Sequence, residues 1–71
     1  MFWYLRTSTS PDPTRYAHLP DAIAQVRRTV RMHAGKTAST TDDGKVELRY
    51  PDGRLFSRIW IEDENGRVMR F

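Results

Sequence analysis

The two histidines and a few scattered acids are the side chains in this sequence that could transfer protons. His18 and His33 are the only imidazoles in the chain, and catalysis requires a nucleophile or a second proton carrier held beside one of them. No spacing ties an acid or a serine to either histidine, and the acidic run 62–64 lacks the glycine and ligand periodicity of a calcium loop. We therefore predict that the protein is not an enzyme, has no cofactor and binds no metal. The enzymatic alternative is a small nuclease or toxin that uses His33.

Arginines interleaved with aromatic residues near the C-terminal end indicate binding rather than catalysis. Guanidinium groups form forked contacts with acids and phosphates, and aromatic rings supply large contact areas. On an alternating strand, Phe56 and Trp60 share one face. The plain alternative is that an arginine lies over Trp60 and shields it from water. The predicted partner-binding residues are Arg49, Phe56, Arg58, Trp60 and Arg70, with Arg70 as the shielding residue in that alternative.

A second basic set lies on the segment with helical periodicity. Its arginines fall on the side opposite Ile23, Val26 and Val30, with a lysine just beyond the end of the segment, and they could contact phosphates there. Such a side is also the ordinary solvated face of an amphipathic helix. The alternative function is therefore a small basic nucleic-acid-binding accessory domain that uses Arg27, Arg28, Arg31 and Lys36.

Length and composition describe a small basic domain. The chain has 71 residues, 12 cations against 9 anions, a formal net charge of +3 and no cysteine. A chain of this size forms one domain, residues 1–71, that hides about 60% of the surface of its unfolded form. Without disulfides, association is the remaining way to add stability. Residues 1–6 have no basic leader and too short an apolar stretch for a membrane span, which predicts a cytoplasmic protein without membrane contact.

Periodicity predicts one helix and four strands. The first strand is expected over Phe2–Thr9, broken by the prolines of residues 10–13 and followed by a loop to His18. Apolar residues recur at spacings of three and four from Leu19 to His33, which predicts a helix with Pro20 in its first turn and Gly35 as a left-handed stop. Residues 35–44 have no periodicity and predict a surface loop.

The last part of the chain predicts a three-stranded meander over residues 45–50, 55–61 and 67–71, with turns at Asp52-Gly53 and Asn65-Gly66. The predicted fold class is thus α+β, with one α-helix packed on a four-stranded, mainly antiparallel sheet in the order strand, helix, strand, strand, strand. The turns allow registers of opposite parity, so strand order and faces stay open on this ground alone.

Packing favours the register that places Ile61 opposite Met69 and Ile59 opposite Phe71. Large apolar residues then lie on both faces of residues 55–61, and one helix can cover only one of them. We therefore expect an open face that binds a partner, and self-association into a homodimer through it is compatible with this interpretation. The face under the helix would hold Val46, Leu48, Tyr50, Leu55, Ile59, Ile61, Met69 and Phe71. The open face would hold Arg49, Phe56, Arg58, Trp60, Val68 and Arg70.

The segments Phe2-Trp3-Tyr4-Leu5 and Asp21–Arg28, followed by glycine-turned strands to Phe71, resemble the small phage-encoded anti-CRISPR proteins with a strand-helix-meander layout. The resemblance spans the whole chain as a layout. It implies a non-enzymatic inhibitor, encoded by a phage or mobile element, that acts in the bacterial host cytoplasm. Such a protein would bind a CRISPR surveillance complex or nuclease and block target-DNA access or cleavage. The basic charge implies contact with an acidic protein surface, guide RNA or DNA rather than DNA mimicry.

Overall fold

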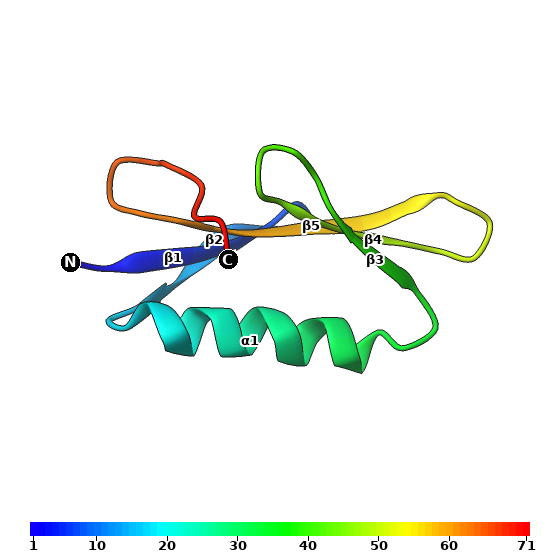
Figure 1. Ribbon diagram of the computed structural model, residues 1–71, viewed down its shortest axis with the longest axis horizontal. Coiled ribbons are helices and arrows are strands. Elements are labelled where there is room, and N and C mark those ends of the chain that lie inside the picture. The colour runs from blue at the N-terminus through cyan, green and yellow to red at the C-terminus, as the bar shows by residue number, and fades with distance from the viewer.

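The computed structural model describes residues 1–71 and shows one helix on one face of a five-stranded antiparallel sheet (Figure 1). The strand order is β2-β1-β5-β4-β3, so β5, the last strand of the chain, lies at the centre of the sheet. The predicted α+β class is confirmed, and the predicted count of four strands is wrong. The elements are β1 (Trp3–Thr7), β2 (Ser10–Tyr16), α1 (Leu19–Met32), β3 (Thr37–Thr40), β4 (Val46–Arg49) and β5 (Leu55–Glu62).

The helix α1 follows the predicted apolar periodicity. Pro20 lies in its first turn with Asp21, Arg31 lies in its last turn, and Ala22 and Val26 are its buried residues. Acids near the start and cations near the end of a helix both complement its dipole. The predicted stop at Gly35 is wrong, because the glycines with positive φ are those of the three later turns. No helix in the structure is long and apolar enough to cross a membrane.

Two strands lie where turn or loop was predicted. Residues 10–16 form β2, which pairs antiparallel with β1. Residues 37–40 form β3, which pairs antiparallel with β4. Both strands lie at the edges of the sheet. Because an edge strand needs hydrogen bonds on one side only, it tolerates prolines and a weak apolar pattern.

The predicted last strand over residues 67–71 is reduced to a single bridge between Glu62 and Val68. Met69 donates its backbone N–H to Ile61 O at 2.7 Å, so the predicted approach of Ile61 and Met69 is present. The predicted pairing of Ile59 with Phe71 is wrong, because Ile59 pairs with Val46 of β4. The strand β4 occupies that edge of β5, and the C-terminal residues therefore leave the sheet.

The buried core lies between α1 and the helix-facing side of β4 and β5. Ala22 and Val26 pack there with Val46, Leu48, Ile59 and Ile61. The four strand residues of this set were predicted on this face. Leu55 and Phe71 were also predicted there, but they are 38% and 49% exposed.

A β-bulge reverses the predicted orientation of Phe56. Leu48 pairs with Ser57 and Arg49 pairs with Leu55, so Phe56 is the extra residue of β5. A bulge of this kind lets two successive side chains leave the strict alternation of the strand. The Phe56 ring lies 5.0 Å from the ring of His33 and 5.6 Å from that of Tyr50, at the end of the helix. The prediction that Phe56 belongs to the open face is therefore wrong.

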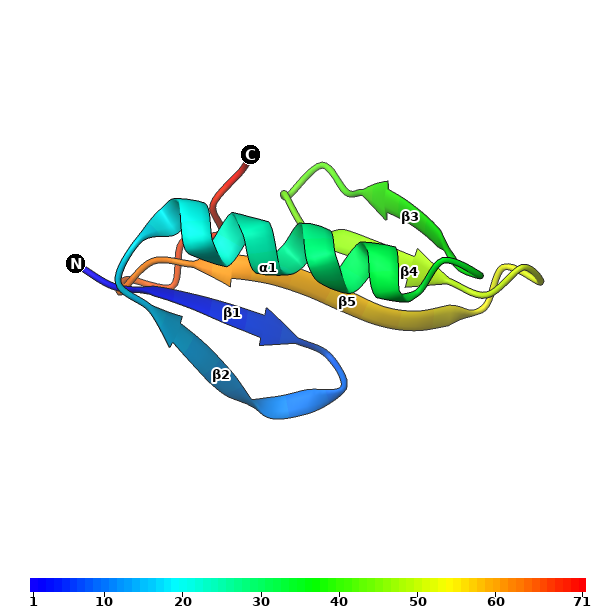
Figure 2. The ribbon, with the colours of Figure 1, turned by 90° about the horizontal axis from the view of Figure 1, so that it is seen from below.

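The helix covers one part of the sheet. It packs mainly on β1, β5 and β2, and Figure 2 shows β3 and the adjoining part of β4 extending beyond it. The sheet therefore has one half beneath a helix and another half without one.

Candidate binding surfaces

The open face of the sheet carries a paired set of polar side chains around Trp60. The Trp60 indole N–H donates to Glu62 Oε1 at 2.8 Å, and Arg6 Nε donates to Glu62 Oε2 at 2.8 Å. The Lys45 ammonium lies 4.4 Å from the centre of the Trp60 ring. The predicted shielding of Trp60 by a cation is present, but the cation is Lys45 and not Arg70, whose guanidinium donates to the backbone carbonyl of Asp42.

Arg49 and Arg58, two predicted partner-binding residues, share the carboxylate of Glu47. Arg58 Nε lies 2.8 Å from Glu47 Oε2, and Arg49 Nη2 lies 3.2 Å from Glu47 Oε1. The hydrogen bond from Arg58, followed by that from Arg49, holds the pKa of Glu47 below its ordinary value. Both arginine side chains keep about half of their surface in solvent, 40% for Arg49 and 47% for Arg58. The open face is therefore internally compensated rather than bare.

A second group of predicted residues lies at the C-terminal end of α1. Lys36 Nζ lies 4.5 Å from the centre of the Phe56 ring and 5.1 Å from that of the Tyr50 ring. His33, the residue at the C-terminal end of α1, packs its ring on Phe56. The structure holds no group of three or more potential metal ligands. This cluster closes the end of the helix over the sheet. Phe56 therefore lies apart from the other predicted partner-binding residues, and Lys36 lies just beyond the helix end, where it was predicted.

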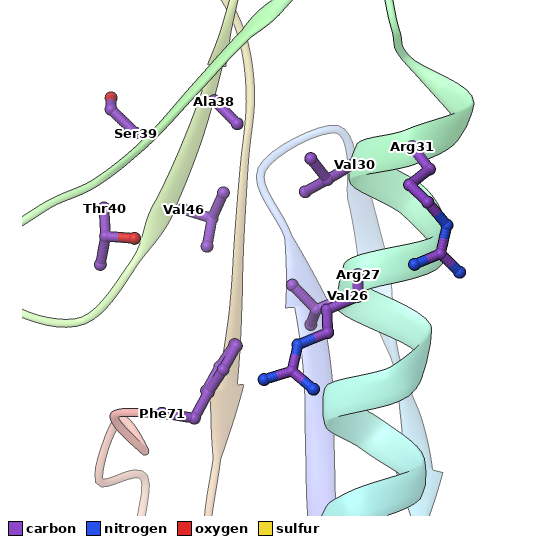
Figure 3. Close-up of a pocket in the computed structure, with 9 residues that line it drawn as sticks. All are labelled: Val26, Arg27, Val30, Arg31, Ala38, Ser39, Thr40, Val46 and Phe71. Atoms are coloured by element: carbon purple, nitrogen blue, oxygen red, sulfur yellow. The ribbon is translucent and has the colours of Figure 1, made fainter.

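A groove runs between α1 and the uncovered half of the sheet, with a volume of about 440 Å³ (Figure 3). In Figure 3, Val26 and Val30 of α1 face Val46 and Ala38 across the groove, and Arg27 extends on the side of Phe71. Its lining is apolar at the floor and basic on the helix side. The lining residues are Val26, Arg27, Val30, Arg31, Ala38, Ser39, Thr40, Val46 and Phe71.

A smaller depression of about 240 Å³ adjoins this groove through Thr40, Val46 and Phe71, and it adds Arg70 to the lining. Neither the groove nor the depression has an aspartate or glutamate in its lining. We call the two together the basic groove. It brings together Arg27, Arg31 and Arg70, which the sequence assigned to two different surfaces.

The arginines of the basic groove carry uncompensated charge. The five ion pairs of the structure use Arg6, Lys45, Arg49, Arg54 and Arg58. Arg27, Arg28 and Arg31 take part in none of them, and α1 contains no acid after Asp21. The positive charge on the second half of α1 is thus available to a ligand, whereas most of that on the open face is already paired.

The predicted site residues therefore fall in three places. Arg49, Arg58 and Trp60 lie together on the open face, Phe56 and Lys36 lie at the helix end, and Arg70 joins Arg27 and Arg31 at the basic groove. Arg28 is exposed on α1 beside this groove but is not part of its lining. Residues of β3 and Phe71 complete this groove and were missed. Residues 37–40 were assigned to a loop, although two of the four are β-branched threonines, the one signal that could have indicated a strand.

Comparisons with known proteins identify no relative of this chain. No protein-family model, no curated protein and no solved structure matches this chain.

Proposed function

We propose that this chain is a non-enzymatic binding protein that receives an acidic segment of a protein partner in the basic groove. The observation that carries the proposal is the charge of Arg27, Arg31 and Arg70, which take part in no ion pair, around an apolar floor with no aspartate or glutamate in the lining. Arginine forks match carboxylates with two parallel hydrogen bonds. A partner with acidic and apolar side chains fits both parts of this lining.

The two parts of the groove contribute differently to binding. Covering Val46, Val30 and the half-exposed Phe71 removes apolar surface from water, which supplies affinity. The arginines add attraction at a distance, which raises the association rate and disfavours basic partners. We therefore expect association to slow with added salt while a part of the affinity remains.

The open face supports the same partner less well. An acidic partner there would compete with Glu47 for Arg49 and Arg58, and with Glu62 for Arg6. Binding would have to break these contacts before it made new ones, and imperfectly paired polar groups reduce affinity. The basic groove carries no such cost.

The acidic-segment proposal is tested by panning the whole protein against a phage-displayed library of random linear peptides. We expect enrichment of peptides rich in glutamate and aspartate, and loss of their capture by the Arg27→Glu/Arg31→Glu variant. The matched control is Arg54→Glu/Arg67→Glu, which makes the same change in net charge at exposed positions outside the groove and should keep capture. Peptides without acidic enrichment, or equal capture by the groove variant, would refute the proposal.

The layout resemblance extends the proposal to a class of partner, a bacterial CRISPR surveillance complex or nuclease whose access to target DNA, or cleavage, the chain would block. A panel of purified effectors of this kind, assayed for target binding and cleavage, tests it. We expect inhibition of at least one effector by the native chain and none by Arg27→Glu/Arg31→Glu. Absence of inhibition across the panel would remove this class of partner and leave the acidic-segment proposal to its own test.

A second candidate, nucleic acid, is favoured by one observation: Arg27, Arg28 and Arg31 are all exposed and free of ion pairs on consecutive turns of α1. Phosphate contacts of this kind give affinity that falls steeply with salt. A labelled random DNA duplex should then bind in proportion to these arginines. Tight, salt-sensitive duplex binding without acidic peptide enrichment would replace the protein partner by nucleic acid.

A further inference from the structure

The edge strand β3 lines the basic groove and presents free backbone groups. All four of its residues are exposed. Thr41, which continues β3, donates its backbone N–H to Lys45 O at 2.7 Å, so the backbone groups of Thr41 point toward β4. Because these groups alternate in direction along an antiparallel strand, those of Ala38 and Thr40 point away from β4. The N–H and C=O groups of these two residues therefore lie on the free edge of the sheet.

The opposite edge of the same sheet is closed. Ser8, which follows β1, donates its backbone N–H to Arg58 O of β5 at 2.9 Å. Because backbone groups alternate in direction along an antiparallel strand, those of the odd-numbered residues of β1 point toward β2. Their partners Thr14 and Ser10 face back toward β1, and Pro11 and Pro13 lie between these two residues, in the irregular part of the edge strand β2. Proline has no N–H to donate, and prolines at an edge prevent the pairing of a further strand. The two edges thus differ in their ability to accept a strand.

We propose that the acidic segment adds to β3 as a sixth strand, a mode of binding that rests on the function proposed above. Ala38 and Thr40 pair with the buried Leu48 and Val46, so their side chains lie on the face of the sheet that carries α1. A strand beside β3 presents every second side chain to that same face. The arginines of the groove lie on that face, and they select a segment whose acids recur at every second position.

The occupant is a partner segment rather than a second copy of the chain. If β3 paired with β3 of a second copy, the groove arginines of both copies would come close to each other. Their like charges would oppose this association. An acidic segment meets the opposite condition, because its charge complements Arg27 and Arg31. Strand addition of this type draws affinity from main-chain hydrogen bonds and selectivity from alternate side chains.

The test uses acidic peptides enriched on the native protein, resynthesised in two backbone-methylated forms. One form carries N-methyl groups at the odd positions and the other at the even positions. Strand addition uses the N–H groups of one parity only, so one form should lose affinity by about tenfold or more while the other binds as before. The protein is unchanged in this experiment, and its folding therefore does not enter the result.

Two further measurements address the protein side. The amides of Ala38 and Thr40 should exchange with solvent rapidly in the free protein and become protected when the unmethylated peptide is bound. The Ala38→Pro/Thr40→Pro variant, which removes two edge donors that do not bond to β4, should lose affinity to the same extent as the sensitive methylated peptide.

The outcomes separate the two proposals. Capture that survives Arg27→Glu/Arg31→Glu refutes the proposed function, and the strand mode with it. Capture that depends on these arginines, together with equal binding of both methylated forms or with acids recurring at helical spacing, overturns strand addition alone. Loss of binding by one methylated form, with protection of Ala38 and Thr40, establishes it.

Discussion

The two edge strands of this sheet, β2 and β3, differ in whether their free backbone groups can pair with a further strand. The β2 edge borders β1, on which α1 packs, although β2 itself is exposed at every residue but Tyr16, and Pro11 and Pro13 remove its free donors. The β3 edge lies on the half that α1 leaves uncovered, and Ala38 and Thr40 keep their donors. An unprotected edge invites another strand. The difference teaches that a small sheet can be closed against aggregation on one side and left open for a ligand on the other.

The largest effect expected from this comparison is on stability. Ile61→Ala removes a fully buried side chain from the core formed with Ala22 and Val26, and it should lower the free energy of unfolding by about 2–5 kcal/mol. Val46→Ala removes fewer methyl groups at the rim of the same core, beside a groove that water can enter, and should cost about 1–2 kcal/mol. Urea unfolding measures both. Equal losses would show that the rim of the core beside the groove is packed as tightly as its centre.

The sequence predicted those parts of the fold whose side chains alternate between a buried and an exposed environment. The helix and β4 have such patterns, and the buried residues Val46, Leu48, Ile59 and Ile61 were assigned to the correct face. The edge strands have no buried face of their own: β2 is exposed at every residue but Tyr16, and β3 at all four. Their stability comes from pairing with a neighbour distant in sequence or across a turn, which periodicity does not record.

The candidate site was harder to predict from the sequence, because it too depends on contacts between residues distant in the chain. The sequence correctly placed Arg49, Arg58 and Trp60 on one face, since strand alternation alone determines it. It misplaced Phe56, because a bulge changes the parity of a strand without a marker in the residues. The basic groove depends on β3, on the exposed Phe71 and on the direction in which α1 crosses the sheet, and none of these is a local property of the chain.

The second prediction opens the closed edge. Pro11→Thr/Pro13→Thr restores two backbone donors on β2 and a residue type that favours strands, so the edge becomes competent to pair with another chain. We expect concentration-dependent association, measured by analytical ultracentrifugation, with the native chain as the reference. The control is Pro20→Ala/Pro51→Ala, which removes two prolines outside β2. A variant that stays as monomeric as the control would show that the prolines do not close this edge.

The third and smallest effect concerns the ion pairs of Glu47 on the face without a helix, of which the pair with Arg58 joins β4 to β5. Arg58 and Arg49 lower the pKa of Glu47 below its ordinary value near 4.5. A group whose pKa is lowered on folding contributes stability above the pKa of the unfolded chain, and this contribution disappears as the pH falls through the pKa of the folded state. The free energy of unfolding of the native chain should therefore decrease as the pH falls below about 4.5.

Glu47→Gln removes this titration, so the variant should be less stable than the native chain near neutral pH and should approach it in acid. Urea unfolding across this pH range measures the convergence, and Glu64→Gln, which neutralises an exposed carboxylate without an ion pair, is the matched control. If the native and Glu47→Gln curves stay parallel, the paired charges do not hold β4 to the sheet. The attachment of β4 to the sheet would then depend on its backbone pairing with β5 and on the core contacts of Val46 and Leu48.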